Sequence, residues 1–511
     1  MAIELGASRM LAPYFSSSQI VWTVIIGAIM IAMALGNIWG GKMADKNPDP
    51  AKLYNRLLIA AIWVALIPFL GKYIITGISL GVAMIVTTNF LVWASLISCL
   101  VIFVFPLMLL GTVTPCLVKY TTQDLDSNAE TVGKLGALNT IGCIIGTFLP
   151  TFVTIPTVGT AATFLIFAGI LGLLSIIYFI AHRKMVIKGV LCICIIIAMA
   201  FATAQYSFAF WESGIVYEGE SIYNYLQVKE DDRSIILSTN VLAGVQSIKM
   251  KDEKLTGMYY DYALAAPFMA GIEKGEGDVL ILGLGTGTFA TMCDQYFPGV
   301  NVEGVEIDQE IVDLATKYFD LPASVEVTVY DGRAYLQRAK KYDVIMVDAY
   351  QDITIPFQMS TVEFFTQIKN SLNDNGVMVV NLNMISNEDG SINQYLCETI
   401  ASVFPENYIV DVSNSSNAEL FAFNNPAQME QFEKAYTDYG NEHSDEDLTN
   451  MMAKVKDNLV KVESGNHILT DDKAPVEVLG MKVLDEMIQG ELDYFKDMMK
   501  SGNLLELING V

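Results

Sequence analysis

The run Val279-Leu280-Ile281-Leu282-Gly283-Leu284-Gly285-Thr286-Gly287 decides the fold of this chain. Four apolar residues followed by Gly-x-Gly-x-Gly predict a buried parallel strand and a tight turn into a helix. Three more strand-like runs follow at helix-sized intervals, at 302–308, 325–331 and 342–348, and each ends in an acidic residue. The pattern predicts an α/β Rossmann-like sheet whose ligand crevice lies at the carboxyl ends of the strands.

The remaining sequence divides into regions of different character. We expect a transmembrane helical domain, a small β-strand region, the Rossmann-like domain and a charged helical C-terminal tail, at 1–210, 211–263, 264–427 and 428–511 respectively. Further strand-like runs lie at 221–228, 234–237, 376–382, 408–412 and 419–423.

Charge separates the two ends of the chain. Residues 1–210 hold eleven Lys or Arg and six Asp or Glu, a net charge of +5, whereas residues 211–511 hold the other twenty and fifty, a net charge of −30. Such acidity excludes a nucleic-acid partner, because phosphate binding requires a basic surface. It favours a small cationic ligand through electrostatic steering, although solubility alone also accounts for it.

The apolar runs of the first 210 residues predict a multi-pass protein of the cell membrane, with the lipid bilayer as a partner. We expect six spans, at 20–41, 57–76, 80–117, 135–155, 159–180 and 189–210. A seventh remains open, because the 38-residue run at 80–117 is long enough for two tight passes. The basic loops do not settle on which side of the membrane the acidic region lies.

Seven Cys and three His are scattered along the chain, and of the seven Cys only Cys293 and Cys397 fall in the acidic part. This spacing indicates neither a disulfide framework nor a metal site.

Backbone and acidic groups at the strand ends indicate an adenosine-type ligand. Gly283, Gly285 and Gly287 let the backbone pass close to a ligand at a helix N-terminus. Glu306, nineteen residues beyond Gly287, suits the two ribose hydroxyls. Asp331 suits an exocyclic adenine amine, with the backbone of Gly332 beside the ring. Helix capping is the competing interpretation for each acid.

Two further acids are candidates for catalysis. Asp348 ends the fourth strand and Asp352 lies in the loop that follows it, with Tyr259, Tyr260 and Tyr350 as candidate walls of the crevice. A carboxylate at this place can bind an alkylammonium and then accept its proton, as transfer to an amine requires. A loop carboxylate that only caps the backbone is the alternative for Asp348.

At these residues the chain resembles the spermidine synthases, which are polyamine aminopropyltransferases. The resemblance rests on Gly283-Leu284-Gly285-Thr286-Gly287, Val305-Glu306-Ile307-Asp308, Tyr330-Asp331-Gly332-Arg333 and Val347-Asp348-Ala349-Tyr350. More narrowly, runs at 4–15, 137–142, 146–150 and 470–477 resemble the bacterial branch that is fused to a major-facilitator-like membrane domain.

The resemblance implies a membrane-anchored transferase of polyamine biosynthesis that moves an aminopropyl group from decarboxylated S-adenosylmethionine to a polyamine such as putrescine. It assigns the ribose to Glu306, the adenine to Asp331 and a cosubstrate contact to Gln246. Asp348 matches the first acid of the catalytic Asp-x-x-Asp loop. No metal is implied, and a homodimer is left open.

The chain departs from the family pattern on the amine side. Soluble spermidine synthases read Gly-Gly-Gly-Asp-Gly where this chain has Thr286, and the second catalytic acid falls at Gln351, one residue before Asp352. The His or Gln and the Glu expected after Tyr260 are Asp261 and Tyr262. Two alternatives therefore stay open, a methyltransferase that uses ordinary S-adenosylmethionine and a non-catalytic membrane transporter or sensor that binds a nucleoside or polyamine.

Overall fold

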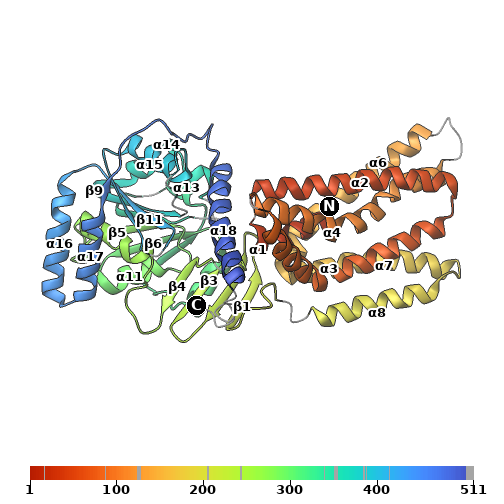
Figure 1. Ribbon diagram of the computed structural model, residues 1–511, viewed down its shortest axis with the longest axis horizontal. Helices are drawn as coiled ribbons and strands as arrows, with labels where there is room; N and C mark the ends of the chain where they lie inside the picture. Colours follow the sequence, from red (N-terminus) through yellow and green to blue (C-terminus); the bar gives the residue numbers. More distant parts are fainter. Residues whose placement is uncertain are drawn as a thin grey trace.

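The computed structural model describes residues 1–501 except 17, 87, 123–127, 204–206, 242–243, 339, 350–354, 384–385, 387 and 414. An apolar helical half and an α/β half lie end to end along the long axis of the molecule (Figure 1).

The helical half begins with a short helix and continues with long apolar ones. Its elements are α1 (Ala2–Phe15), α2 (Gln19–Lys46), α3 (Pro50–Ile85), α4 (Phe90–Gly111), α5 (Val113–Thr121), α6 (Asn128–Leu149), the π-helical turn η2 (Pro150–Thr154), α7 (Ile155–Ala181) and α8 (Val186–Ala202). Among the described residues, four continuous helical segments are long and apolar enough to cross a membrane, at 19–46, 50–85, 90–121 and 128–181, and α8 is a shorter apolar helix.

The prediction of one apolar unit over 80–117 is wrong at its start. Residues 80–85 form the last turns of α3, and the helix ends before Asn89, whose φ of 55° is left-handed. Hydrophobicity alone did not mark this boundary, because both sides of the break are apolar. The expected spans at 135–155 and 159–180 meet at Gly159, whose φ of 80° interrupts the helix.

A small antiparallel sheet joins the halves. Its strands are β1 (Ile215–Glu220), β2 (Tyr225–Glu230), β3 (Ser234–Ser238) and β4 (Ser247–Met250), paired in chain order. The expected strand at 221–228 is wrong in its first half, because residues 221–224 form the turn between β1 and β2. The side-chain pattern did not reveal this turn, in which the Ser221 hydroxyl accepts from the backbone N–H of Asn224 at 2.9 Å.

The main sheet confirms the Rossmann-like prediction. Its strands are β5 (Asp278–Leu282), β6 (Asn301–Glu306), β7 (Glu326–Val329), β8 (Tyr342–Val347), β9 (Leu372–Asn383), β10 (Glu406–Asp411), β11 (Asn417–Phe423) and β12 (Val460–Lys461). Within the described chain the order is β12-β10-β11-β9-β8-β5-β6-β7. The strands from β7 to β9 run parallel, and β11 joins β9 antiparallel. The order reverses between β5 and β8, which is where doubly wound sheets bind ligands.

Helices cover both faces of this sheet. They are α9 (Tyr259–Ala263), α10 (Ala265–Ala270), α11 (Thr288–Tyr296), α12 (Gln309–Tyr318), α13 (Gly332–Tyr335), η3 (Phe357–Met359), α14 (Val362–Ser371), α15 (Ile392–Val403), α16 (Ala427–His443), α17 (Glu446–Asn458) and α18 (Val476–Ser501). Alternate residues of each strand enter two separate cores, one with α9, α10, α11, α16 and α17 and the other with α14, α15 and α18. Both faces are thus buried, as a parallel sheet requires.

Helix α18 stands at the boundary between the two halves (Figure 1). Met481, Leu484 and Ile488 pack against the core of the helical half, and Asp485 accepts hydrogen bonds from the backbone N–H groups of Asn89 and Phe90 at 2.6 and 2.8 Å. The C-terminal helix therefore caps the start of α4 as well as covering the sheet.

Candidate active site

A cavity of about 330 Å³ lies at the carboxyl ends of β5, β6 and β8. Most of the site residues predicted from the sequence line this cavity, namely Gln246, Tyr260, Gly283, Gly285, Glu306, Asp331, Gly332 and Asp348. Gly287 is not among the lining residues, because it lies at the start of α11 against Leu321. Asp352 lies outside the described residues.

The glycine turn brings two strand ends into contact. Gly283 has a φ of +87°, and a Cβ atom there would lie 2.4 Å from the backbone oxygen of Asp348. The backbone N–H of Gly285 donates to Glu306 at 2.9 Å. Since only glycine allows this approach, the turn fixes Asp348 and Glu306 relative to each other.

Glu306 is a buried carboxyl held by backbone groups. It accepts from the N–H of Gly285 and from the N–H of Asp308, the latter at 3.0 Å. Burial raises the pKa of Glu306 to about 7, although the backbone hydrogen bonds oppose the shift. Its place at the end of β6, beside the cavity, suits a ribose hydroxyl.

Asp331 both lines the cavity and caps a helix. Its side chain accepts from the N–H of Ala334 at 2.7 Å, so the capping interpretation holds for this residue. Tyr330, Gly332 and Met359 also line the cavity, so its lining is partly apolar, as in most small-molecule sites.

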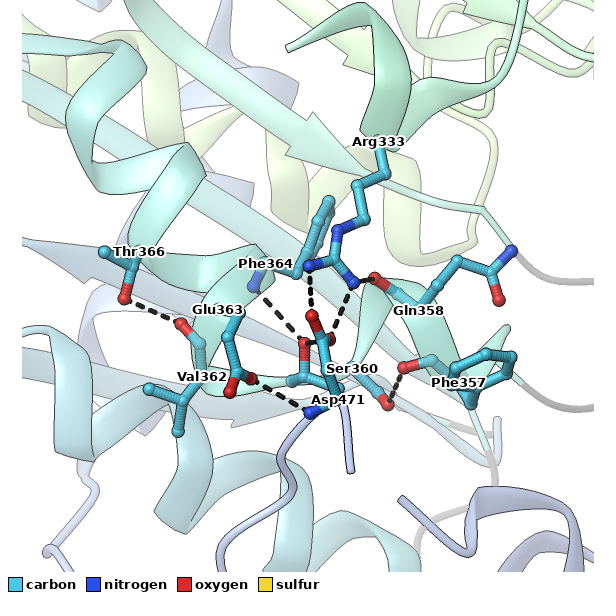
Figure 2. Close-up of polar contacts among 10 residues, drawn as sticks. Arg333, Phe357, Gln358, Ser360, Val362, Glu363, Phe364, Thr366 and Asp471 are labelled. Carbon is cyan, nitrogen blue, oxygen red and sulfur yellow. Dashed lines mark hydrogen bonds and ion pairs between the residues drawn. The ribbon is translucent and has the colours of Figure 1, made fainter. Parts of the chain in front are cut away.

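A charged network supports this end of the cavity (Figure 2). Arg333 reaches from α13 to both carboxylate oxygens of Asp471, at 2.7 and 2.6 Å, and donates to the backbone oxygen of Gln358 at 2.9 Å. Asp471 also accepts from the Thr361 hydroxyl at 2.7 Å. Gln358 lines the cavity. The bonds of Arg333 to Gln358 and to Asp471, which lies in the run at 470–477, therefore hold this wall of the cavity in place.

Asp348 is the acid at the opposite end of the cavity. It accepts from the Tyr259 hydroxyl at 2.7 Å and from the Asn381 amide at 2.9 Å. Burial raises its pKa to about 7 against the effect of these two bonds. Such a carboxyl exchanges a proton near neutral pH, as a general base must.

Two neighbouring tyrosines make different bonds at the cavity. Tyr260 lines the cavity and its hydroxyl donates to the backbone oxygen of Gln246 at 3.0 Å, while the Tyr259 hydroxyl donates to Asp348. The rings lie 4.0 Å apart between centroids. Tyr260 therefore holds the segment of Gln246, and Tyr259 holds Asp348. Tyr350 lies outside the described residues.

Glu419 is a third acid that the sequence analysis missed. It lies on β11 opposite Asn381 of β9, is 0% exposed, and neither of its carboxylate oxygens has a hydrogen-bond partner in the structure. Burial and the nearby charge of Asp348 raise its pKa well above the usual value. One feature of the sequence could have indicated Glu419, because it is an acid within the apolar run 418–423. A buried strand rarely contains a carboxylate unless that group has a binding or catalytic role.

Thr286, the main departure from the family pattern, points away from the cavity. It is 1% exposed, and it faces a neighbouring cavity lined by Lys249 and Glu253. Its backbone N–H donates to the Ser247 hydroxyl at 3.2 Å.

Comparison with known proteins identifies the family. Residues 266–414 match the spermine/spermidine synthase domain. The chain is 51% identical over 351 residues to a probable polyamine aminopropyl transferase of Bifidobacterium longum, covering 66% of this chain and 78% of the relative. The chain belongs to the polyamine aminopropyltransferase family. A polyamine aminopropyltransferase of Vibrio vulnificus is 30% identical over 220 residues, which cover 41% of this chain and 71% of the relative.

A solved structure of a probable spermidine synthase from Corynebacterium glutamicum is also similar, at 18% identity, with a TM-score of 0.36 and coverage of 44% of this chain and 87% of that one. That likeness adds nothing to what the sheet order already shows. Membership of the aminopropyltransferase family makes the chain a transferase, so a purely non-catalytic role is set aside.

The glycine turn yields a test of how the aminopropyltransferase site is held. We expect Gly283→Ala to destabilise the protein by about 2 kcal/mol more than Gly257→Ala, as measured by thermal unfolding. Both glycines have a positive φ, but a Cβ at Gly257 meets no described atom within 4 Å. Equal losses for the two variants would show that backbone strain alone, without the contact to Asp348, accounts for the glycine.

Proposed function

We propose that this chain transfers the aminopropyl group of decarboxylated S-adenosylmethionine to a polyamine such as putrescine. The observation that carries the proposal is Asp348, a half-buried carboxyl with a pKa raised to about 7, which lines the same cavity as the nucleoside-type residues Glu306 and Asp331. Family membership supports the same reaction class.

Asp348 has two tasks in this mechanism. An alkylamine resembles Lys, so holding it neutral at pH 7 costs roughly 4–5 kcal/mol. Asp348 binds the ammonium and takes its proton, which frees the nitrogen lone pair. The nitrogen attacks the carbon beside the sulfonium, the carbon–sulfur bond breaks, and its electron pair leaves with methylthioadenosine. Tyr259 and Asn381 keep the carboxylate in line for this transfer.

We propose that the nucleoside part of the cosubstrate binds along the carboxyl ends of the strands. Glu306 accepts from the ribose hydroxyls, and Asp331 with the backbone of Gly332 takes the adenine edge. Gln246 lines the cavity and is fixed by Tyr260, in keeping with a role beside the cosubstrate. Gly283 and Gly285 let this nucleoside approach the backbone.

A methyltransferase remains the second candidate because Thr286 replaces the acid that holds the aminopropyl amine in the family pattern, and its side chain faces a different cavity. A site without that acid discriminates less strongly against the carboxylate of ordinary S-adenosylmethionine.

The unpartnered Glu419 supports an acceptor that carries a second positive charge. A polyamine has two or more ammonium groups, and a buried acid beside Asp348 offers the second of them a charge-assisted hydrogen bond. We therefore propose that Asp348 takes the reacting nitrogen and Glu419 the remote one.

The helical half is proposed to anchor the enzyme in the membrane as a multi-pass domain. Large apolar side chains on its helices face outward, including Phe152, Ile187 and Phe201, which are 69%, 86% and 79% exposed. Lipid would cover such side chains, whereas water would make them a large aggregation surface.

The first prediction concerns Asp348→Asn. We expect kcat for methylthioadenosine release from decarboxylated S-adenosylmethionine and putrescine to fall roughly 10²- to 10⁴-fold, because the amide cannot accept the proton. Asp374→Asn, the same change at an exposed position of β9, should leave the rate unchanged.

The pH dependence follows from the pKa of about 7. In the wild type, the rate should rise with pH while Asp348 loses its proton and level off above about pH 7, and the variant should lose this limb. A faster reaction with ordinary S-adenosylmethionine and no transfer from the decarboxylated form would replace the proposal by a methyltransferase.

The second prediction concerns Glu419→Gln. Burial raises the pKa of this carboxyl, and pairing with an ammonium should lower it, so binding of the acceptor should favour release of its proton. Calorimetric titration of putrescine into the methylthioadenosine complex, in two buffers of different ionisation enthalpy, should show that the variant releases fewer protons than the wild type. Exposed Glu430→Gln is the matched control. Equal release from wild type and Glu419→Gln would remove Glu419 from the acceptor site.

The third prediction concerns the membrane. The full chain should stay in the membrane fraction after washing with alkaline carbonate and should be released by detergent, because apolar helices are held by lipid rather than by charge. Release by the carbonate wash would contradict a multi-pass anchor.

A further inference from the structure

The turn between β1 and β2 forms one wall of the nucleoside cavity. Tyr223 and Asn224 of this turn line the cavity. The Ser221 hydroxyl and the Asn224 amide both donate to Asp308, the latter at 3.1 Å, and the backbone N–H of Asp308 donates to Glu306 at 3.0 Å. On its inner side, the turn is thus bonded to the carboxyl groups at the end of β6.

Helix α1 of the helical half holds the outer side of the same turn. The Arg9 guanidinium donates to the backbone oxygen of Ser221 at 3.1 Å and to the backbone oxygen of Ile222. Arg9 is more than two hundred residues away from its partners in the sequence. A planar guanidinium suits two neighbouring carbonyls, because its N–H groups form a fixed fork.

Three more hydrogen bonds join the helical half to the small sheet. Glu220, at the end of β1, accepts from the N–H and the hydroxyl of Thr160 in α7, at 2.8 and 2.6 Å. The N–H of Val241 donates to the backbone oxygen of Pro13 in α1 at 3.0 Å, just after Thr239, which also lines the cavity. The end of β1, the turn at 221–224 and the segment after β3 are therefore tied to α1 or α7.

A second cavity, of about 210 Å³, lies between α1 and the small sheet. Arg9, Trp22 and Glu220 line it, and it shares Tyr223, Asn224 and Thr239 with the nucleoside cavity. The same three side chains thus separate a space bounded by α1 from the space for the nucleoside.

We propose that Arg9 is a positioning residue for cosubstrate binding, and that the helical half pre-orders the turn at 221–224 over the nucleoside. This proposal rests on the nucleoside site of the proposed function. A turn that is already fixed loses little conformational freedom when the ligand binds, whereas a loose turn must be ordered at the expense of affinity. The helical half then contributes to binding as well as to anchoring.

The test uses the full-length protein in detergent and methylthioadenosine as the probe, with Kd measured by calorimetry. Arg9→Gln should raise Kd about tenfold, and Arg9→Lys, which keeps the charge without the fork, about threefold. Asp485→Asn is the matched control, because it removes a bond between the same two halves, at α18 and α4, away from the turn. Its Kd should stay within about twofold of wild type.

Thermal unfolding of each variant separates positioning from stability. A purely structural role would lower the unfolding temperatures of Arg9→Gln and Asp485→Asn while leaving both Kd values alone, and that result would overturn the proposal. If Arg9→Gln does not fold, an unchanged Kd in Arg9→Lys overturns it instead. A wild type that fails to bind methylthioadenosine contradicts the proposed function itself, which is a different outcome from a wild type and an Arg9→Gln variant that bind equally.

Discussion

The burial of acidic groups close to the carboxyl ends of the parallel strands is the constraint on which the rest of the structure depends. Glu306 and Glu419 are buried and Asp348 is half-buried, and a carboxylate shielded from water is tolerated only with strong partners or as the neutral acid. Backbone N–H groups hold Glu306, and Tyr259 with Asn381 holds Asp348, whereas Glu419 has no hydrogen-bond partner among the residues that the structure describes. An acid without a partner in this part of the sheet is what a cationic ligand would pair with.

The order of the strands makes this concentration of acids unavoidable. Because β5 lies between β6 and β8, the acids that end β6 and β8 flank the glycine turn that follows β5. Any side chain at Gly283 would push against the backbone of Asp348, so the turn sets the spacing of the two ends of the ligand. The antiparallel pairing of β11 with β9 then places Glu419 opposite Asn381, next to the same crevice.

The sequence allowed prediction of what depends on neighbours along the chain. Apolar runs that end in glycine or an acid located β5, β6, β7 and β8, and with them six of the eight predicted site residues that line one cavity. The sequence did not allow prediction of interactions between distant segments of the chain. The role of Tyr259 rather than Tyr260 depends on which ring faces Asp348, and the importance of Glu419 depends on a strand pairing made late in the chain. The turn at 221–224 was hidden because its side-chain pattern also suits a strand.

The contact of Arg9 with the small sheet indicates that the helical half of such an enzyme does more than anchor it. An anchor alone needs a flexible connection, since tight coupling to the catalytic half would add strain without benefit. Here α1 and α7 make hydrogen bonds to the small sheet, and α18 of the α/β half accepts hydrogen bonds from the start of α4. The bonds of α1 and α7 reach the end of β1 and the turn at 221–224, which lines the cavity. A charge-assisted bond to the backbone of a substrate-covering turn fixes that turn before the substrate arrives. Through Arg9, the helical half is thus bonded directly to the turn whose Tyr223 and Asn224 line the cavity.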